Sequence, residues 1–439
     1  AVPEKKDARR QDEQRPFLAQ VGDETVAFFS SAGRLLAFIG DATLAFARLL
    51  RGQAYFRRSD LLLIIESCGG GALPIVSLIS FLVGLILAFV GFGSKAGVFP
   101  FHVWLPHAHP AASSHISAVM SGVMIKTGIY GILRIYAALD WHTALFGDIV
   151  LIAGIVSGVL GVVYALGQHD LKRLLAYHSV ENIGIILIGI GIGMLGVAAG
   201  KPVMAVLGFA GGLLHVLNHA IFKSLLFMGA GMVLHKTGTR TIDLLGGLIK
   251  KMKISGTTFL IGSLAISGLP PLNGFVSEFL VYMGGFRGMT LDKSSFAMCL
   301  LAIVSLAIIG GLALACFTKV VGVVFQGEPR SQIAENTDEK GVTMLLPMLI
   351  LAAACIVIGV FPTFFMTMAL KAVASLGLGY GQIPLEPFIK LTGNITRAAA
   401  LIFAVFLLIL VFRKLLYRGK TVTRSGTWGC GFTRPTVKM

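Results

Sequence analysis

The sequence predicts an all-α fold: a polytopic bundle of about nine transmembrane helices, some of them broken within the membrane. Three observations predict it. Hydrophobic residues make up 55% of the 439 positions and charged residues only 13%, whereas soluble domains carry about 25% charged residues. Apolar runs close to the roughly 20 residues of a spanning helix recur along the chain. The 54 glycines are typical of helices that pack closely in lipid.

The elements follow one another in a simple order. Residues 1–16 are rich in charge, which predicts disorder. Residues 17–66 mix apolar positions such as Phe28 and Leu35 with Arg34 and Asp41, which predicts an amphipathic helix at the membrane interface. Candidate spans then follow at residues 72–92, 115–137, 147–167, 174–198, 203–234, 255–284, 297–326, 343–371 and 397–417.

The loop charges give an orientation. With the basic tail, residues 418–439, placed in the cytoplasm, the cytoplasmic loops between the last eight spans hold most of the loop Lys and Arg, as the positive-inside rule requires. The same rule places the arginines before the span at 72–92, such as Arg57 and Arg58, in the cytoplasm, which is the opposite orientation for that span. The sequence therefore predicts a junction near Gly91–Gly93. It separates a part at 17–91 from a transporter domain at 92–417.

Ionisable side chains lie inside several apolar spans, although each costs about 2.5–3.5 kcal/mol or more at the bilayer centre. His215, His219 and Lys223 are four residues apart, so they form one polar stripe on a helix. Lys126 lies in the middle of another span. A chain of Lys and His groups joined by water can pass protons, and a purely structural role for these groups is the alternative.

Two further ionisable groups lie beside predicted helix breaks. Glu278 follows Pro270 and Pro271, which should break the helix in mid-membrane beside protein or a water-filled cavity. Lys95 precedes Pro100, where a second break is expected. Lys319 is a further embedded cation. Lys95 and Lys319 have the alternative that their side chains reach a membrane interface.

Other functions lack their usual sequence signals. The net charge of +16 lies mainly in short loops, which indicates topology rather than nucleic-acid binding. The five cysteines are far apart and have no metal-ligand or redox-pair spacing. His102, His107 and His109 have no nearby Cys or carboxylate to complete a metal site, so packed or solvated loop histidines are expected. No nucleotide-binding loop or nucleophile elbow is present, and we expect no cofactor, no metal and no nucleic acid.

From Gly93 to Met439 the chain resembles the proton-conducting membrane subunits shared by complex I, Mrp-type cation/proton antiporters and membrane-bound hydrogenases. Five motifs carry the resemblance: GSKAGVFPFHVWLPHAHP (93–110), MIKTGIYG (124–131), DLKRLLAYHS (170–179), HVLNHAIFKSLLF (215–227) and GLPPLNGFVSEF (268–279). The acid at Glu278, where many relatives have lysine, and the tail at 427–439 favour the hydrogenase-4/formate hydrogenlyase branch.

The resemblance implies a role for each matching residue. Lys95 matches the lysine of a broken helix in the first half-channel, and Lys126 matches the connecting lysine. Lys223 matches the central lysine of the second half-channel, Glu278 the terminal exit residue, and His215 with His219 the relay histidines. The glutamate that the family pairs with the position of Lys95 has no counterpart in the sequence.

The resemblance also implies a setting. It predicts a non-catalytic subunit that moves H⁺ or Na⁺ in a bacterial inner membrane. Its partners would be other membrane subunits of a hydrogenase or complex I-like assembly, and the lipid bilayer.

Residues 17–91 resemble the N-terminus of a different protein, the permease of the Mla-type lipid-asymmetry ABC transporter. The similarity runs through residues 57–69 and 72–91. Two alternative functions therefore stay open beside proton translocation: a phospholipid permease, and a non-functional fusion of the two parts.

Overall fold

A computed structural model describes residues 87–139, 143–290, 293–339, 341–377 and 386–420, with scattered positions between 33 and 84. The predicted segments at 1–16 and 17–66, most of the span at 72–92 and the tail from residue 421 lie outside the described residues. By backbone contacts the chain divides into residues 1–83 and 84–439, and the account below concerns the second unit.

The described residues of this unit are almost entirely helical, which confirms the predicted all-α class. The α-helices are α3 (Leu105–Ala111), α4 (Ser114–Val119), α5 (Lys126–Ala138), α6 (Ala144–Leu166), α7 (Leu171–Ala198), α8 (Pro202–Thr237), α9 (Lys253–Ile266), α10 (Asn273–Gly288), α11 (Lys293–Val320), α12 (Gln332–Glu335), α13 (Val342–Val360), α14 (Pro362–Ala374) and α15 (Glu386–Leu416). Two π-helical turns, η1 (Met120–Met124) and η4 (Val321–Phe325), follow α4 and α11 directly. Two 3₁₀ turns, η2 (Ile242–Leu244) and η3 (Leu248–Lys250), lie between α8 and α9.

Seven helices within the described residues are long and apolar enough to cross a membrane. Each corresponds to a predicted span, although α13 covers only the first part of its span, and the two remaining predicted spans have no counterpart among the seven. The span at 72–92 lies largely outside the described residues. The one at 255–284 forms two shorter helices, α9 and α10, with the break where the prolines predicted it. The one at 343–371 is also two helices, α13 and α14.

The break between α13 and α14 was not predicted from the sequence. Pro362 begins α14, because its missing N–H group is tolerated in the first turn of a helix but not in the interior. Gly359, near the end of α13, touches the backbone of Pro271 and Leu272, so a side chain at this position would overlap them. The end of α13 therefore packs directly on the α9–α10 break.

Local sequence signals explain where the central helices begin and end. Asp170 caps α7, and its Oδ1 accepts a hydrogen bond from the Arg173 N–H at 3.0 Å. Helix α8 begins at Pro202 and ends before Gly238, which has the left-handed conformation of a helix C-cap. Between α9 and α10, Gly268 has a φ of 64° and precedes the two prolines. The opening Pro202 and the closing Gly238 bound α8, which is the longest helix among the described residues.

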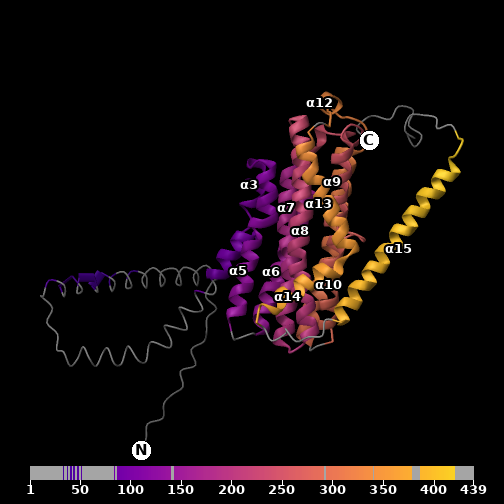
Figure 1. The fold of residues 1–439 in the computed structure, drawn as a ribbon. Coiled ribbons are helices and arrows are strands. Elements are labelled where there is room, and N and C mark those ends of the chain that lie inside the picture. Colours follow the sequence, from indigo (N-terminus) through magenta and orange to yellow (C-terminus); the bar gives the residue numbers. More distant parts are fainter. Residues whose placement is uncertain are drawn as a thin grey trace, which may run out of the picture. The chain divides into compact units, whose positions relative to one another are not determined.

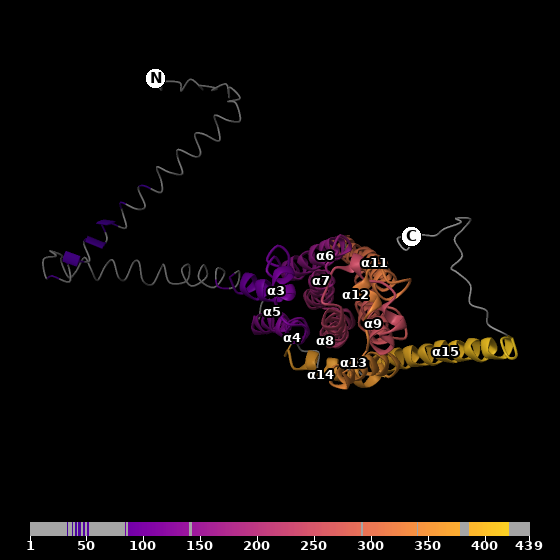
Figure 2. The same cartoon turned by 90° about the horizontal axis from the view of Figure 1, so that it is seen from above.

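Helices α7 and α8 form the centre of the bundle, and the other spans pack around them (Figure 1, Figure 2). In the most apolar window of α7, 94% of residues are buried, and in that of α8 72%. The corresponding share in α15 is only 11%, and this helix leads away from the bundle in both views. The ionisable groups in the central parts of α7 and α8, such as Glu181 and Lys223, are therefore enclosed by protein rather than by lipid.

A seam of glycines joins α6 to α7. Gly154 and Gly158 on α6 face Gly184 on α7, where an added Cβ would overlap their backbone atoms, and Gly161 faces Glu181 in the same way. Small residues let helix backbones approach in lipid, where van der Waals contact drives association. This seam holds α7 in the position from which its polar side chains reach α8.

Candidate functional site: a buried row of ionisable groups

The predicted polar stripe lies on the buried face of α8. His215, His219 and Lys223 are all fully buried, and the two imidazole rings are 6.5 Å apart between centroids. The Lys223 Nζ lies 5.9 Å from the centroid of the Phe227 ring. Neither ring nitrogen of His219 nor Nζ of Lys223 has a hydrogen-bond partner among the described residues. These groups can therefore exchange protons without first breaking a bond to protein.

His215 differs from its neighbours because both of its ring nitrogens have partners. Its Nε2 lies 3.1 Å from Asn182 Oδ1 on α7, and its Nδ1 lies 2.9 Å from Ser277 Oγ on α10. Asn218, one turn along α8, donates to the same Ser277 oxygen at 2.9 Å. Three helices thus meet at this one imidazole.

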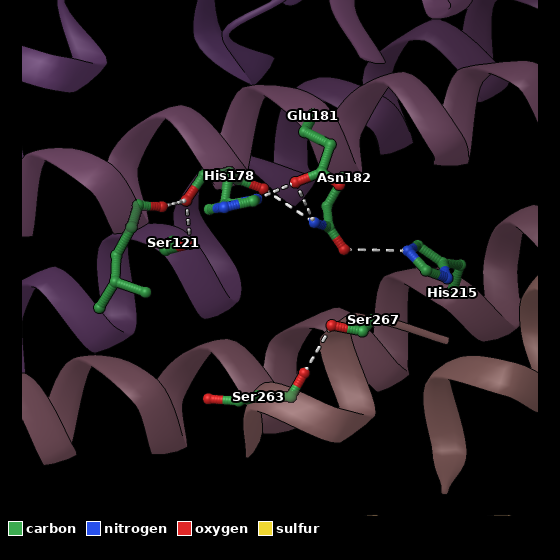
Figure 3. A network of polar contacts seen from close by, with 9 residues as sticks. Ser121, His178, Glu181, Asn182, His215, Ser263 and Ser267 are labelled. Atoms are coloured by element: carbon green, nitrogen blue, oxygen red, sulfur yellow. Dashed lines mark hydrogen bonds and ion pairs between the residues drawn. The ribbon is translucent and has the colours of Figure 1, made fainter. Parts of the chain in front are cut away.

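An acid–histidine pair on α7 joins the row, and sequence reasoning missed it. His178 and Glu181 are fully buried and form an ion pair between Nδ1 and Oε2. Asn182 links this pair to His215, because its Nδ2 lies 3.4 Å from the same glutamate oxygen (Figure 3). The signal was available: both residues lie inside the predicted span at 174–198, where an ionisable group needs a functional reason.

Lys126 approaches the row from α5. It is buried, and its Nζ donates to the backbone carbonyl of Ser121 in the π-helical turn η1. The Ser121 hydroxyl lies 2.8 Å from that of Ser179 on α7 (Figure 3). A π-helical turn frees backbone groups that an α-helix would use, and such turns are frequent at functional sites.

Glu278 lies on α10 next to the predicted helix break. It is 8% exposed, and a Cβ added to Gly268 would fall against its carboxyl group. The glycine therefore leaves room for the carboxyl group beside the exposed backbone of the break. Ser277, the partner of His215, precedes Glu278 directly.

The structure does not bring Lys95 and Lys319 into this row. Lys95 is exposed near the end of a helical segment that closes at residue 96. The Nζ of Lys319 donates to the carbonyls of Leu166 at 2.9 Å and Gln168 at 3.2 Å. Lys319 therefore caps the C-terminal end of α6, as cations commonly do at a helix terminus.

The three histidines expected in a loop do not converge, and His107 and His109 lie in helix α3 instead, because the Pro at the second position opens a short helix there. The His102 ring stacks on Phe99 with centroids 5.1 Å apart, and His107 is exposed. The His109 ring stacks on Phe227 at 4.6 Å, and neither of its nitrogens has a partner among the described residues. His109 thus lies on the same phenylalanine that Lys223 approaches.

A pocket of about 750 Å³, lined mainly by apolar residues with a few polar groups, lies next to the end of α3. Its lining includes Pro110, next to His109, together with Lys172 on α7 and His235 on α8. Lys172 is almost fully buried and donates from Nζ to the Ala112 carbonyl at 2.7 Å. A cavity of this size with polar partners can hold several waters.

These features define a class: a polytopic α-helical membrane protein whose central helices enclose a row of ionisable side chains. The chain belongs to the family whose model is described as "NADH:quinone oxidoreductase/Mrp antiporter, TM", which matches residues 70–305. That match begins before the junction predicted near Gly91–Gly93, so it includes the predicted span at 72–92.

Curated relatives include two proteins of Escherichia coli strain K12. Hydrogenase-4 component B is 47% identical over 62% of this chain and 41% of its own length. Formate hydrogenlyase subunit 3 is 39% identical over 79% of this chain and 56% of its own length. The chain therefore spans about half the length of the curated relatives it matches.

Solved structures share the fold. One is the membrane-bound sulfane sulfur reductase, an archaeal respiratory membrane complex. A chain of it aligns with a TM-score of 0.62 and 26% identity, over 84% of this chain and 60% of its own. Another is the Mrp complex from Dietzia sp. DQ12-45-1b, with a TM-score of 0.59 and 22% identity over 72% and 61% of the two chains. The second similarity concerns the fold alone.

Proposed function

We propose that this chain translocates protons across the membrane along Lys126, His215, His219, Lys223 and Glu278, and that it has no catalytic centre of its own. The single observation that carries the proposal is the burial of these ionisable groups together, around α8, inside a bundle whose core is mainly apolar. Burying ionisable groups costs free energy, and a proton path is a function that needs such groups inside the membrane. The His178–Glu181 pair adds a buried acid beside the row.

Replacing Lys223 by methionine is expected to lower proton flux at least about tenfold, because the row then loses a group that binds and releases protons. Methionine keeps most of the length and volume of the lysine side chain. The flux would be followed with a pH-sensitive dye inside proteoliposomes that contain the full chain and the membrane subunits that co-purify with it.

Lys236→Met is the matched control. It makes the same substitution on the same helix, but Lys236 lies in the last turn of α8 and pairs with Asp338 at 3.1 Å. It should leave the flux close to that of the unmodified protein. Undiminished flux in Lys223→Met would contradict the proposed relay.

We further propose that the chain works within a redox-linked assembly of the bacterial inner membrane, with other membrane subunits as partners. The sequence similarity to hydrogenase-4 component B and formate hydrogenlyase subunit 3 supports this setting. The transported ion is proposed to be H⁺, with Na⁺ as the alternative that a pH-clamped sodium-uptake assay would distinguish.

The permease resemblance of residues 17–91 stays a separate proposal, because those residues lie almost entirely outside the described part of the chain. It predicts that the chain co-purifies with an ATPase subunit. Co-purification with hydrogenase subunits alone would instead support the proton-translocating role, and absence of the full-length chain from membranes would support a non-functional fusion.

A further inference from the structure

The hydrogen bonds around His215 fix where its hydrogen atoms lie. Asn182 Nδ2 donates to the His178 backbone carbonyl at 2.8 Å. A carbonyl oxygen only accepts, so the amide of Asn182 has a single orientation, and its Oδ1 must face His215 Nε2. Two acceptors would repel each other at 3.1 Å. His215 Nε2 therefore carries a hydrogen in every state that keeps this contact.

On the Nδ1 side of the ring, the Ser277 hydroxyl has one hydrogen atom and two possible acceptors for it. Asn218 Nδ2 donates its two hydrogens to the Asn273 carbonyl at 2.7 Å and to Ser277 Oγ at 2.9 Å. Ser277 Oγ also lies 2.9 Å from His215 Nδ1 and 3.0 Å from the Gly274 carbonyl. A hydroxyl group has only one hydrogen to donate, so Ser277 can serve one of these two acceptors at a time.

We propose that Ser277 is a hydroxyl switch that lets His215 bind and release a proton without moving its ring. In the neutral state the Ser277 hydroxyl donates to Nδ1. When a proton from the row binds Nδ1, the hydroxyl rotates to the Gly274 carbonyl, and Nδ1–H donates to Ser277 Oγ. Nε2–H donates to Asn182 Oδ1 throughout, so the ring gains one proton and one charge while both of its nitrogens keep a hydrogen-bond partner.

This arrangement makes His215 different from His219, the next group in the row. The His219 nitrogens have no partner among the described residues, so nothing on the protein selects a tautomer there. His215 is held in both protonation states, which lowers the reorganisation that a proton transfer needs. Ser277 and Asn182 are therefore positioning residues, whereas His215 holds the proton.

The switch also lies next to the α9–α10 break. Gly274 and Ser277 lie in the first turns of α10, directly after the proline-rich segment. The buried titratable groups on the helices around His215 are Lys126 on α5, Lys172, His178 and Glu181 on α7, His219 and Lys223 on α8, and Glu278 on α10. Each can bias the switch through its own charge, so the tautomer must be measured directly rather than through a titration.

Nitrogen-15 NMR of the full chain in lipid bilayers, with labelled histidine, tests the proposal. The His215 signals are assigned by their loss in His215→Gln. We expect neutral His215 to show a pyrrole-type Nε2 and a pyridine-type Nδ1. A neutral form with the hydrogen on Nδ1 would overturn the inference.

Proton flux gives the second test, and in it the inference rests on the proposed function. Ser277→Ala removes both roles of the hydroxyl and should lower flux about tenfold, whereas Ser277→Thr retains the hydroxyl and should restore most of it. Flux that is unchanged in Ser277→Ala but lost in Lys223→Met would overturn the switch and leave the proposed function standing. Flux retained in Lys223→Met would overturn the proposed function, and the NMR result would still decide on the switch.

Discussion

Replacing His178 by phenylalanine is expected to lower the free energy of unfolding by about 3–5 kcal/mol. The substitution keeps an aromatic ring in place, next to Phe317 at 4.6 Å between centroids, so the loss does not come from a cavity. It removes the partner of Glu181, which is fully buried and whose Oε1 has no hydrogen-bond partner among the described residues. An acid left without its partner in this interior is what makes the change costly.

Thermal unfolding measured with a thiol-reactive dye would check this prediction. Cys299, Cys316 and Cys355 are buried, so they react only when the bundle opens, and Cys68 and Cys430 would first be replaced by serine in all variants. The double variant His178→Phe/Glu181→Met removes both charged groups and should recover much of the stability. A double variant as unstable as His178→Phe would contradict the assignment of the loss to an unpaired acid.

Much of the fold could be predicted from the sequence because the bilayer imposes a simple rule. A spanning helix needs about 20 apolar residues, and runs of this kind mark α6, α7, α8 and α11 directly. Proline pairs predicted the α9–α10 break. The α13–α14 break was not predicted, because the run across Pro362 stays apolar on both sides, and the close packing of Gly359 on a distant segment is not visible in the sequence.

The polar stripe on α8 could be predicted from helical spacing, which is a local property of the sequence. The partners of His215 could not be predicted, because Asn182 and Ser277 come from α7 and α10, and their approach depends on how three helices pack. His178 and Glu181 could have been found from their place inside an apolar span.

Lys95 and Lys319 were predicted to belong to the proton row, and the structure does not place them there. An apolar neighbourhood in the sequence does not distinguish a lysine inside a bundle from one whose side chain reaches a helix end. Lys319 caps the end of α6 through the carbonyls of Leu166 and Gln168. The role that the resemblance implies for Lys95 stays a prediction, and the glutamate that the family pairs with this position has no counterpart in the sequence.

The second large effect is expected at the glycine seam between α6 and α7. Replacing Gly184 by leucine should lower the free energy of unfolding by at least about 3 kcal/mol, the upper end of typical overpacking costs. The atoms in its way are backbone atoms of Gly154 and Gly158, which cannot rotate aside as a side chain would. The two helices must therefore move apart, and α7 carries Asn182 and Glu181 with it.

Gly311→Leu separates this packing effect from the effect of removing a glycine. Gly311 lies inside the long helix α11, and a Cβ built there meets no atom within 4 Å. Without a clash, losing a helical glycine should stabilise the protein by about 0.5–1 kcal/mol. The same dye assay would measure both variants, and equal losses in the two would contradict a close α6–α7 contact. Because the seam sets the position of α7, Gly184→Leu should also displace Asn182 from His215, so any folded fraction should show a His215 Nε2 signal that differs from that of the unmodified protein.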